Sequence, residues 1–519
     1  MTRVKRNIAA NLAGRGWAIL LSFALIPVYI RYLGVEAYGL IGFYLTLTAV
    51  ATVVDPGFGT TLTREFARLG GGTPEPAPAT VPAPGTPATT PRRPADLLRT
   101  LEVLTLAIAV AIALTVAALS PAIARGWLRA DTLDPELLAQ AIALMGVALA
   151  AQWPTPFYSG GLAGLQHQVT LNAILAIGAT LRGIGSLLVL AFVANDIRAF
   201  FAWQAVAFAL QSMLMGAMLW RRFPGEARIA RMRLDSLRGV ARFTLGVWAI
   251  TMLGTTAAQA DKLMLSTLLP LVQFGYYMLA AAIASVATLL VGPIFSAVMP
   301  RMTELVAGGN PKEVTGFYHG ASQLLAAVTL PIALTLIVFA PEALRLWTGD
   351  AAIAAAATPI VQALAAAAAL NALVNAPYAL QLAHGWTRLG VGMGVFNLAL
   401  AIPALWWGAT HHGAVGAAVA YALVCLANLA IGMTLLHARY LRGEALNWLL
   451  RDTLPPALAS ALVVGLARLL LPADAGPLAM AGCLALTLAA ALAASAVAAR
   501  STREYLLGIA SGLAARRNA

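Results

Sequence analysis

The chain has 519 residues, of which 60% are hydrophobic and only 11% are charged. Soluble globular domains carry about 25% charged residues, so this chain has too few to cover a soluble protein of its size. The net charge of +13 does not indicate a nucleic-acid partner, because a basic excess in an apolar chain reports membrane topology. The composition therefore predicts an all-α, polytopic membrane protein.

Apolar runs of about 20 residues, the length a helix needs to cross a bilayer, recur along the whole chain. They predict about fourteen transmembrane helices, at residues 8–32, 38–62, 99–121, 137–158, 169–194, 198–220, 243–268, 274–299, 315–340, 353–380, 386–409, 413–436, 453–471 and 477–499. The two cysteines, Cys425 and Cys483, lie inside such runs, and the chain has no nucleotide-binding or zinc motif. We therefore expect no metal, no cofactor and no catalytic residue.

The positive charges divide unevenly between the segments that join these runs. If the N-terminus lies in the cytoplasm, 25 of the 34 Lys and Arg residues fall in or beside inner segments and six in outer segments. Positive residues accumulate on the cytoplasmic side of membrane proteins. The pattern therefore predicts an even number of spans with both termini in the cytoplasm.

Two of the cytoplasmic segments have unusual compositions. Residues 70–96 contain eight Pro and four Gly, which predicts disorder because such a segment cannot bury a core. In residues 221–242, arginines at helical spacing face apolar residues. This pattern is typical of an amphipathic helix on the inner leaflet, and a solvated charged connector is the alternative.

Short similarities between distant segments indicate an internal repeat. Tyr38-Gly39 corresponds to Phe274-Gly275, and Pro156-Phe157 corresponds to Pro377-Tyr378 in the same order. The expected domains are an N-terminal six-helix bundle, a linker, a C-terminal six-helix bundle, and two additional helices with a cytoplasmic tail. Their bounds are 1–220, 221–242, 243–438 and 439–519. Parallel repeats of this kind are a transporter arrangement, with the substrate between the halves.

One arginine is expected deep in the membrane. Arg182 lies midway along the run 169–194, where insertion of an arginine costs about 2.5–3.5 kcal/mol. It should therefore face either a hydrated cavity or a structural partner.

Other polar residues form stripes along single helices. Asn11 and Arg15 share one face of the first span, and Asp55 follows Thr48 and Thr52 at helical spacing in the second. Gln259 and Lys262 share a face of the seventh span, with Asp261 beside them. Hydroxyl residues also occur in ordinary helix contacts, but the stripes with charges favour a cavity between the halves.

Three stretches carry a resemblance to a known family. Residues 26–39 read IPVYIRYLGVEAYG and residues 55–65 read DPGFGTTLTRE. Residues 260–265 read ADKLML, followed by FGYY at 274–277 and MPR at 299–301. The chain resembles bacterial polysaccharide (oligosaccharide) flippases of the Wzx type, in the multidrug/oligosaccharidyl-lipid/polysaccharide exporter superfamily.

The resemblance implies two six-helix bundles around a central cavity, two additional C-terminal helices and translocation of undecaprenyl-pyrophosphate-linked oligosaccharide across the inner membrane. A polysaccharide polymerase and a chain-length regulator are the implied partners, besides membrane lipids. Arg31, Asp55, Arg64 and Asp261 match motif positions. The expected substrate-binding residues are Asn11, Arg15, Arg31, Arg64, Arg182, Gln259 and Lys262. Asp55 and Asp261 are the candidates for coupling to H⁺ or Na⁺.

Two other functions remain open at this point. A multidrug antiporter of the same superfamily would need buried carboxylates for organic cations, whereas the first span offers Arg15. A polysaccharide polymerase or glycosyltransferase of the membrane would need a large outer loop with acid and base residues. The longest expected outer loop, residues 122–136, has no paired histidine and carboxylate.

Overall fold

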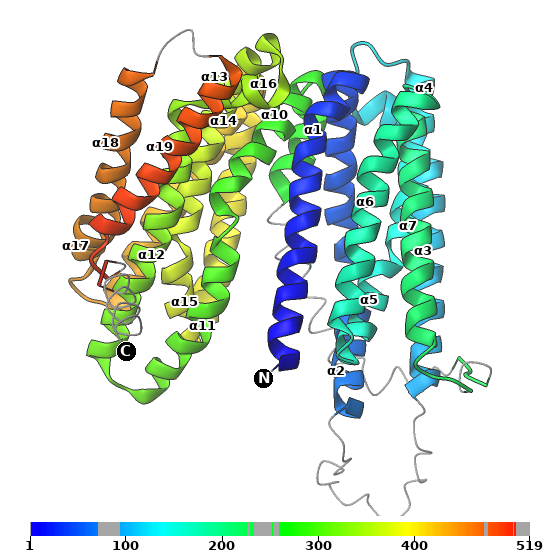
Figure 1. Ribbon diagram of the computed structural model, residues 1–519, viewed down its shortest axis with the longest axis horizontal. Coiled ribbons are helices and arrows are strands. Elements are labelled where there is room, and N and C mark those ends of the chain that lie inside the picture. Colours follow the sequence, from blue (N-terminus) through cyan, green and yellow to red (C-terminus); the bar gives the residue numbers. More distant parts are fainter. Residues whose placement is uncertain are drawn as a thin grey trace, which may run out of the picture. The chain divides into compact units, whose positions relative to one another are not determined.

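The computed structural model describes residues 2–70, 94–225, 229–232, 252, 259–471, 476–501 and 503–504. Every secondary-structure element in this part of the chain is a helix (Figure 1), which confirms the all-α prediction. The chain forms two compact units, residues 1–259 and 260–519. The Pro-rich prediction falls almost entirely on residues 71–93, which lie outside the described residues.

The first unit contains α1 (Thr2–Ala51), α2 (Phe58–Gly70), α3 (Pro94–Ala122), α4 (Pro135–Gln152), α5 (Pro154–Gly164), α6 (Gln168–Phe192) and α7 (Ile197–Trp220). Helix α6 packs against α1 and α7, and α4 packs against α3 and α7. Figure 1 shows these helices side by side. Buried apolar side chains from α2, α3, α5, α6 and α7, among them Phe66 and Phe157, form a core at one end of the unit.

The second unit begins within a helical segment, 259–268. It continues with α10 (Leu271–Ala284), α11 (Val291–Gly308), α12 (Pro311–Val338), α13 (Ala340–Thr348), α14 (Ala351–Leu373), α15 (Asn375–Ala383) and α16 (Thr387–Tyr440). The C-terminal part contains α17 (Ala445–Asn447), the π-helical turn η4 (Trp448–Thr453), α18 (Leu454–Leu470) and α19 (Pro477–Ala498). Both α18 and α19 pack on α12.

Within the described residues, 11 helical segments are long and apolar enough to span a membrane. They correspond to thirteen of the fourteen predicted spans, because two long segments each cover a predicted pair. The helix α1 turns at Gly34, whose φ is 81°, and α16 turns at His412-Gly413, where the φ of Gly413 is 58°. The remaining span, 243–268, lies mostly outside the described residues. Leucines such as Leu458 and Leu478 are 60% and 91% exposed, as a lipid-facing surface requires. The chain is a multi-pass membrane protein.

The two units interrupt their helices at corresponding places. The 3₁₀ turn η1 (Thr52–Val54) precedes α2, and the 3₁₀ turn η3 (Ser285–Thr288) precedes α11. Helix α4 gives way to α5 at Trp153, and α14 gives way to α15 at Val374. These two breaks occur in the same order in both units.

Two expectations about local structure differ from the fold. The polar stripe of the second span is not a continuous helical face, because the helix ends before Asp55, whose carboxylate accepts a hydrogen bond from the Gly57 backbone N–H at 2.9 Å. The linker is not helical at residues 221–225 and 229–232, the parts of it that are described. The Arg231 backbone N–H donates instead to the Asp96 side chain at 2.9 Å, and Pro224-Gly225 favours a turn.

Candidate functional site

Arg182, the arginine predicted to lie deepest, is held between helices α6 and α7. Its Nη1 donates a hydrogen bond to the side-chain oxygen of Gln211. The guanidinium carbon lies 4.4 Å from the ring centre of Phe208, one turn away on α7. Gln211 and Phe208 are buried, at 4% and 8% exposure. Both partners are neutral, and a guanidinium over an aromatic face is stabilised by the ring quadrupole.

The sequence of α6 leaves room for this contact. A Cβ at Gly178 would lie 1.8 Å from the Gln211 side-chain oxygen, and a Cβ at Gly185 would lie 2.3 Å from Nε1 of Trp203. The Trp203 ring nitrogen donates to the Leu181 carbonyl at 2.9 Å. Small residues let membrane helices approach closely, so the glycines around Arg182 bring α7 near enough for Gln211 to reach it.

The charge of Arg182 has no acidic partner in the described part of the chain. The phenols of Tyr29 and Tyr44 are close enough to interact electrostatically with its guanidinium. Tyr29 donates to the Gly183 carbonyl at 3.1 Å, and Tyr44 donates to the Gln152 side-chain oxygen at 2.9 Å. A charge removed from water is normally paired, but the contacts described for Arg182 leave its positive charge without a countercharge.

Asp261 marks a second polar cluster, at the start of the second unit. Its carboxylate accepts hydrogen bonds from the Lys262 ammonium at 3.2 Å and from the Tyr277 hydroxyl at 3.3 Å. Asp261 is 6% exposed, and its immediate ion pair with Lys262 leaves the two charges balanced. Tyr421 and Cys425 of α16 also lie close to this carboxylate.

The other predicted residues occupy varied environments. Asn11 and Arg15 lie on α1, but their side chains are outside the described residues. Arg31 and Arg64 are exposed, and Gln259 is partly buried. Asp55 lies in the break between η1 and α2. In the second unit, Asp261 pairs with Lys262. In the first unit, Arg182 contacts Gln211 and Phe208, which were not predicted as its partners.

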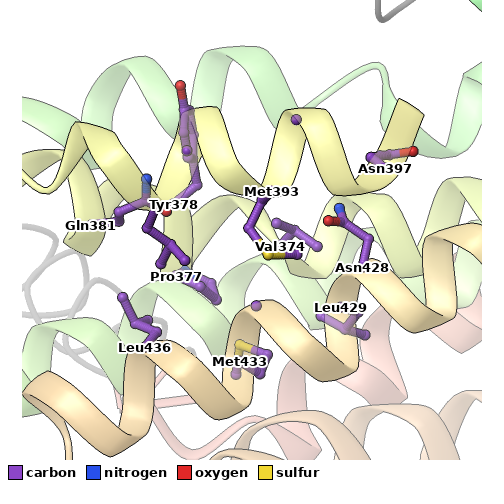
Figure 2. Close-up of a pocket in the computed structure, with 14 residues that line it drawn as sticks. Val374, Pro377, Tyr378, Gln381, Met393, Asn397, Asn428, Leu429, Met433 and Leu436 are labelled. Carbon is purple, nitrogen blue, oxygen red and sulfur yellow. The ribbon is translucent and has the colours of Figure 1, made fainter. Parts of the chain in front are cut away.

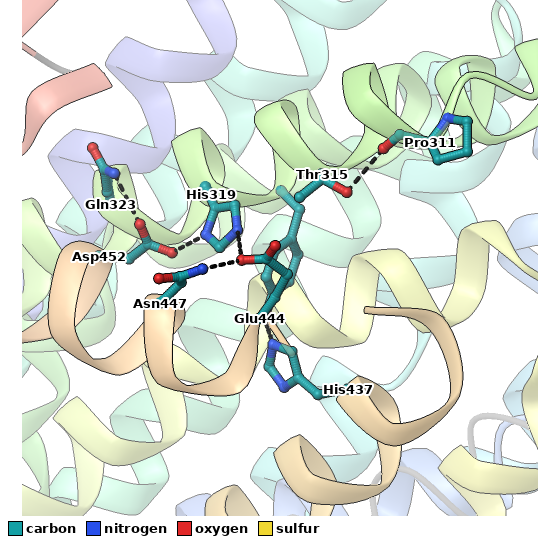
Figure 3. Close-up of polar contacts among 9 residues, drawn as sticks. Pro311, Thr315, His319, Gln323, His437, Glu444, Asn447 and Asp452 are labelled. Carbon is teal, nitrogen blue, oxygen red and sulfur yellow. Dashed lines mark hydrogen bonds and ion pairs between the residues drawn. The ribbon is translucent and has the colours of Figure 1, made fainter. Parts of the chain in front are cut away.

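A third polar cluster, between α12 and the turn η4 of the second unit, was not predicted (Figure 3). His319 of α12 contacts two carboxylates: its Nδ1 faces Asp452 of η4, and its Nε2 lies 3.3 Å from Glu444. The imidazole can donate at both nitrogens only as the imidazolium. The Asn447 side chain donates to Glu444 at 2.6 Å, and this hydrogen bond, followed by the charge of His319, holds the pKa of Glu444 below its ordinary value.

Gln323 extends this cluster to Ser501, which follows α19. Its amide nitrogen donates to Asp452 at 2.9 Å, and its oxygen accepts from the Ser501 backbone N–H at 2.8 Å. Asp452 is only 1% exposed. The cluster therefore clamps the two C-terminal helices to α12. The one signal in the sequence was a histidine inside an apolar run, whose partner lay more than a hundred residues away.

The described residues contain no group of three or more His, Cys, Asp or Glu side chains that could hold a metal ion.

Comparison with known proteins gives a family and a fold. A family profile described as "Polysaccharide biosynthesis protein" matches residues 4–306. No curated protein sequence matches the chain. A solved structure of the lipid II flippase MurJ, in an inward closed conformation, is similar over 95% of this chain and 98% of its own, with a TM-score of 0.68 and 10% identity.

Two further solved structures share the fold. An inward-facing multidrug resistance MATE family transporter of the MOP superfamily has a TM-score of 0.64 and 14% identity, covering 82% of this chain and 94% of its own. A MOP superfamily transporter from Pyrococcus furiosus, whose title reports a binding pocket of reverse polarity, has a TM-score of 0.54 and 13% identity, covering 84% and 96%. The fold is thus that of the MOP superfamily.

Proposed function

The chain belongs to the polysaccharide biosynthesis protein family, and we propose that it translocates undecaprenyl-pyrophosphate-linked oligosaccharide units across the bacterial inner membrane. It is a membrane transporter and not an enzyme. The cargo we propose serves the synthesis of a surface polysaccharide, such as O-antigen, capsule or exopolysaccharide. A polysaccharide polymerase and a chain-length regulator would act on the delivered units.

The observation that carries this proposal is the unbalanced charge of Arg182. Solved structures of this fold include a lipid II flippase and a multidrug transporter, so the fold alone does not select the cargo. A positive charge whose described partners are the neutral Gln211 and Phe208 attracts an anion and repels an organic cation. The planar guanidinium can form two parallel hydrogen bonds with a pyrophosphate.

The multidrug antiporter is the second candidate, and the polar cluster around Asp261 is its best support. However, Asp261 lies 3.2 Å from the Lys262 ammonium, so its charge is already balanced. A carboxylate paired in this way is a poor site for a cationic drug. This arrangement favours the lipid-linked anion as the cargo.

In the proposed mechanism, two six-helix halves, 1–220 and 243–438, enclose a hydrated cavity and open it alternately to each side. The corresponding helix breaks of the two units support this repeat. Arg182 together with Asn11, Arg15, Arg31, Arg64, Gln259 and Lys262 would bind the head group, while the polyprenyl tail stays in lipid. Asp55 or Asp261 would couple the cycle to H⁺ or Na⁺, since each charge that crosses 100 mV supplies about 2.3 kcal/mol.

The proposal is tested with the purified full-length protein in liposomes. Translocation of fluorescent undecaprenyl-pyrophosphate oligosaccharide is measured by its accessibility to an impermeant quencher, beside uptake of a cationic dye. We expect lipid translocation without dye transport. Dye transport without lipid translocation would instead identify a multidrug antiporter.

The proposed orientation, with both termini and residues 70–96 and 221–242 in the cytoplasm, is tested by cysteine labelling. After Cys425 and Cys483 are replaced, Gly85→Cys should react with an impermeant reagent only in inverted vesicles. Labelling of Gly85→Cys in intact spheroplasts would show that the topology is the reverse of the proposed one.

A further inference from the structure

A pocket of about 190 Å³ lies within the second unit, between α15 and the two halves of α16 (Figure 2). Its polar lining residues are Tyr378, Gln381, Asn397 and Asn428. None of its lining residues is charged. Sites for drug-sized ligands typically have volumes of about 300–1,000 Å³. This pocket is smaller, so it suits a ligand of the size of one small chemical group.

The two asparagines lie deep in the membrane. Asn397 is near the middle of the first half of α16, which ends at the turn of His412-Gly413, and Asn428 is near the middle of the second half. Figure 2 shows them near one end of the pocket, with Tyr378 and Gln381 near the other. In the described part of the chain, neither asparagine side chain makes a hydrogen bond. An amide at this depth without a partner is costly, so these two side chains are suited to hold a polar ligand.

The other residues that line the pocket are mostly apolar, and the glycines among them leave space for a ligand. Tyr378 is 41% exposed, and its ring stacks on Phe295 with a centroid distance of 5.8 Å. Gly394 and Gly432 also line the pocket, and a Cβ at Gly394 would meet no atom within 4 Å. The apolar side chains of Val374, Leu429 and Met433, together with amides that both donate and accept, match a sugar ring, which has an apolar C–H face and hydroxyl groups at its edge.

We propose that this pocket binds one neutral sugar residue of the transported lipid-linked oligosaccharide, a step that rests on the proposed function. The absence of lining charge argues against the pyrophosphate and against a cation as its ligand. The two units differ in a way that supports separate binding sites for the pyrophosphate and for the sugar. The last two long helices of the first unit, α6 and α7, contain Arg182 and its amide partner, whereas the two halves of α16 contain only neutral amides at this pocket.

The test compares the affinities of two probes for the full-length protein in lipid nanodiscs. One probe is undecaprenyl pyrophosphate, and the other is undecaprenyl-pyrophosphate oligosaccharide isolated from the host cells. We expect the wild-type protein to bind the glycosylated probe more tightly. Two lost amide contacts at about 1 kcal/mol each predict that the Asn397→Leu/Asn428→Leu variant binds this probe at least about tenfold more weakly. Its affinity for the bare carrier should be unchanged.

Matched variants separate sugar binding from damage to the fold. Asn375→Leu is the control, because this asparagine of α15 donates to the Asn371 and Ala372 carbonyls at 3.1 Å and does not line the pocket. Gly394→Leu should fill the pocket without a backbone clash and weaken the glycosylated probe alone. It replaces the double variant if the latter does not fold.

Three results would overturn the inference. The pocket variants could bind the glycosylated probe as tightly as wild type, they could lose both probes equally, or the wild type could show no preference for the sugar. Failure of the wild-type protein to bind either probe would instead reject the proposed function, and the inference with it.

Discussion

Arg182 of α6 and Gln211 of α7 are joined side chain to side chain, with the guanidinium donating to the amide oxygen. This contact orients the arginine but leaves its charge intact, because a glutamine is neutral. An aspartate or glutamate at position 211 would have made a balanced ion pair. The choice of an amide therefore preserves the positive charge of Arg182 inside the first unit.

Replacement of Arg182 tests this charge directly. Arg182→Ala should abolish export of the surface polysaccharide at normal protein levels, because the pyrophosphate loses its cationic partner. Arg182→Lys should retain part of the activity, since it keeps the charge but loses the planar fork. Arg182→Glu should abolish export as alanine does, because its carboxylate also repels the pyrophosphate. Export and membrane abundance are measured together in a deletion strain.

The matched control is Arg198→Ala, since Arg198 pairs with Asp196 at 2.5 Å on an exposed part of the same unit. Its loss should leave export unchanged. Arg15→Ala, made in parallel, should also abolish export. Full export by both Arg15→Ala and Arg182→Ala proteins would remove the support for a cationic site.

The glycine that accommodates Gln211 gives an independent test. Gly178→Ala places a Cβ 1.8 Å from the Gln211 oxygen, so the amide must move away from Arg182. We expect a loss of stability of about 1–3 kcal/mol from overpacking, together with reduced export. Thermal unfolding of the purified protein measures the first effect. Gly16→Ala, where a Cβ meets nothing within 4 Å, should leave both unchanged, and equal behaviour of the two variants would contradict this packing argument.

The paired charges Asp261 and Lys262 allow a test of ion coupling. Asp261→Asn should stop transport, either because the coupling ion loses its site or because Lys262 is left unpaired in the membrane. The double variant Asp261→Asn/Lys262→Met removes both charges. The double variant stays inactive in the liposome assay if Asp261 couples the ion or if Lys262 binds the head group. Recovery of transport in the double variant would show that the carboxylate only balances Lys262.

The clamp centred on Asp452 should govern the stability of the C-terminal helices. Asp452→Leu leaves His319 and Gln323 without their buried partner, and breaking a buried ion pair costs about 3–5 kcal/mol. We expect a lower unfolding temperature and faster proteolysis between α17 and α19. The exposed pair Arg500–Glu504, with side chains 79% and 61% exposed, provides the control. Unchanged stability of the Asp452→Leu protein would show that the clamp is dispensable.

Hydropathy and charge were enough to predict a helical, multi-pass membrane protein, because each spanning helix must be about 20 apolar residues long whatever it packs against. The predicted runs matched the described helices closely, and a family resemblance carried by short motifs agreed with the family match over residues 4–306. The depth of Arg182 was also visible, since depth follows from position along a span.

The partners of these polar residues were decided by tertiary structure. Gln211 reaches Arg182 because the glycines of α6 let α7 pack closely against it. His319 contacts Asp452, which lies 133 residues further along the sequence. The pocket that contains Asn397 and Asn428 exists only because α16 folds back at His412-Gly413 and packs with α15. Periodicity along one helix shows which residues share a face, but the residue opposite that face belongs to another helix, and its identity depends on how the helices pack.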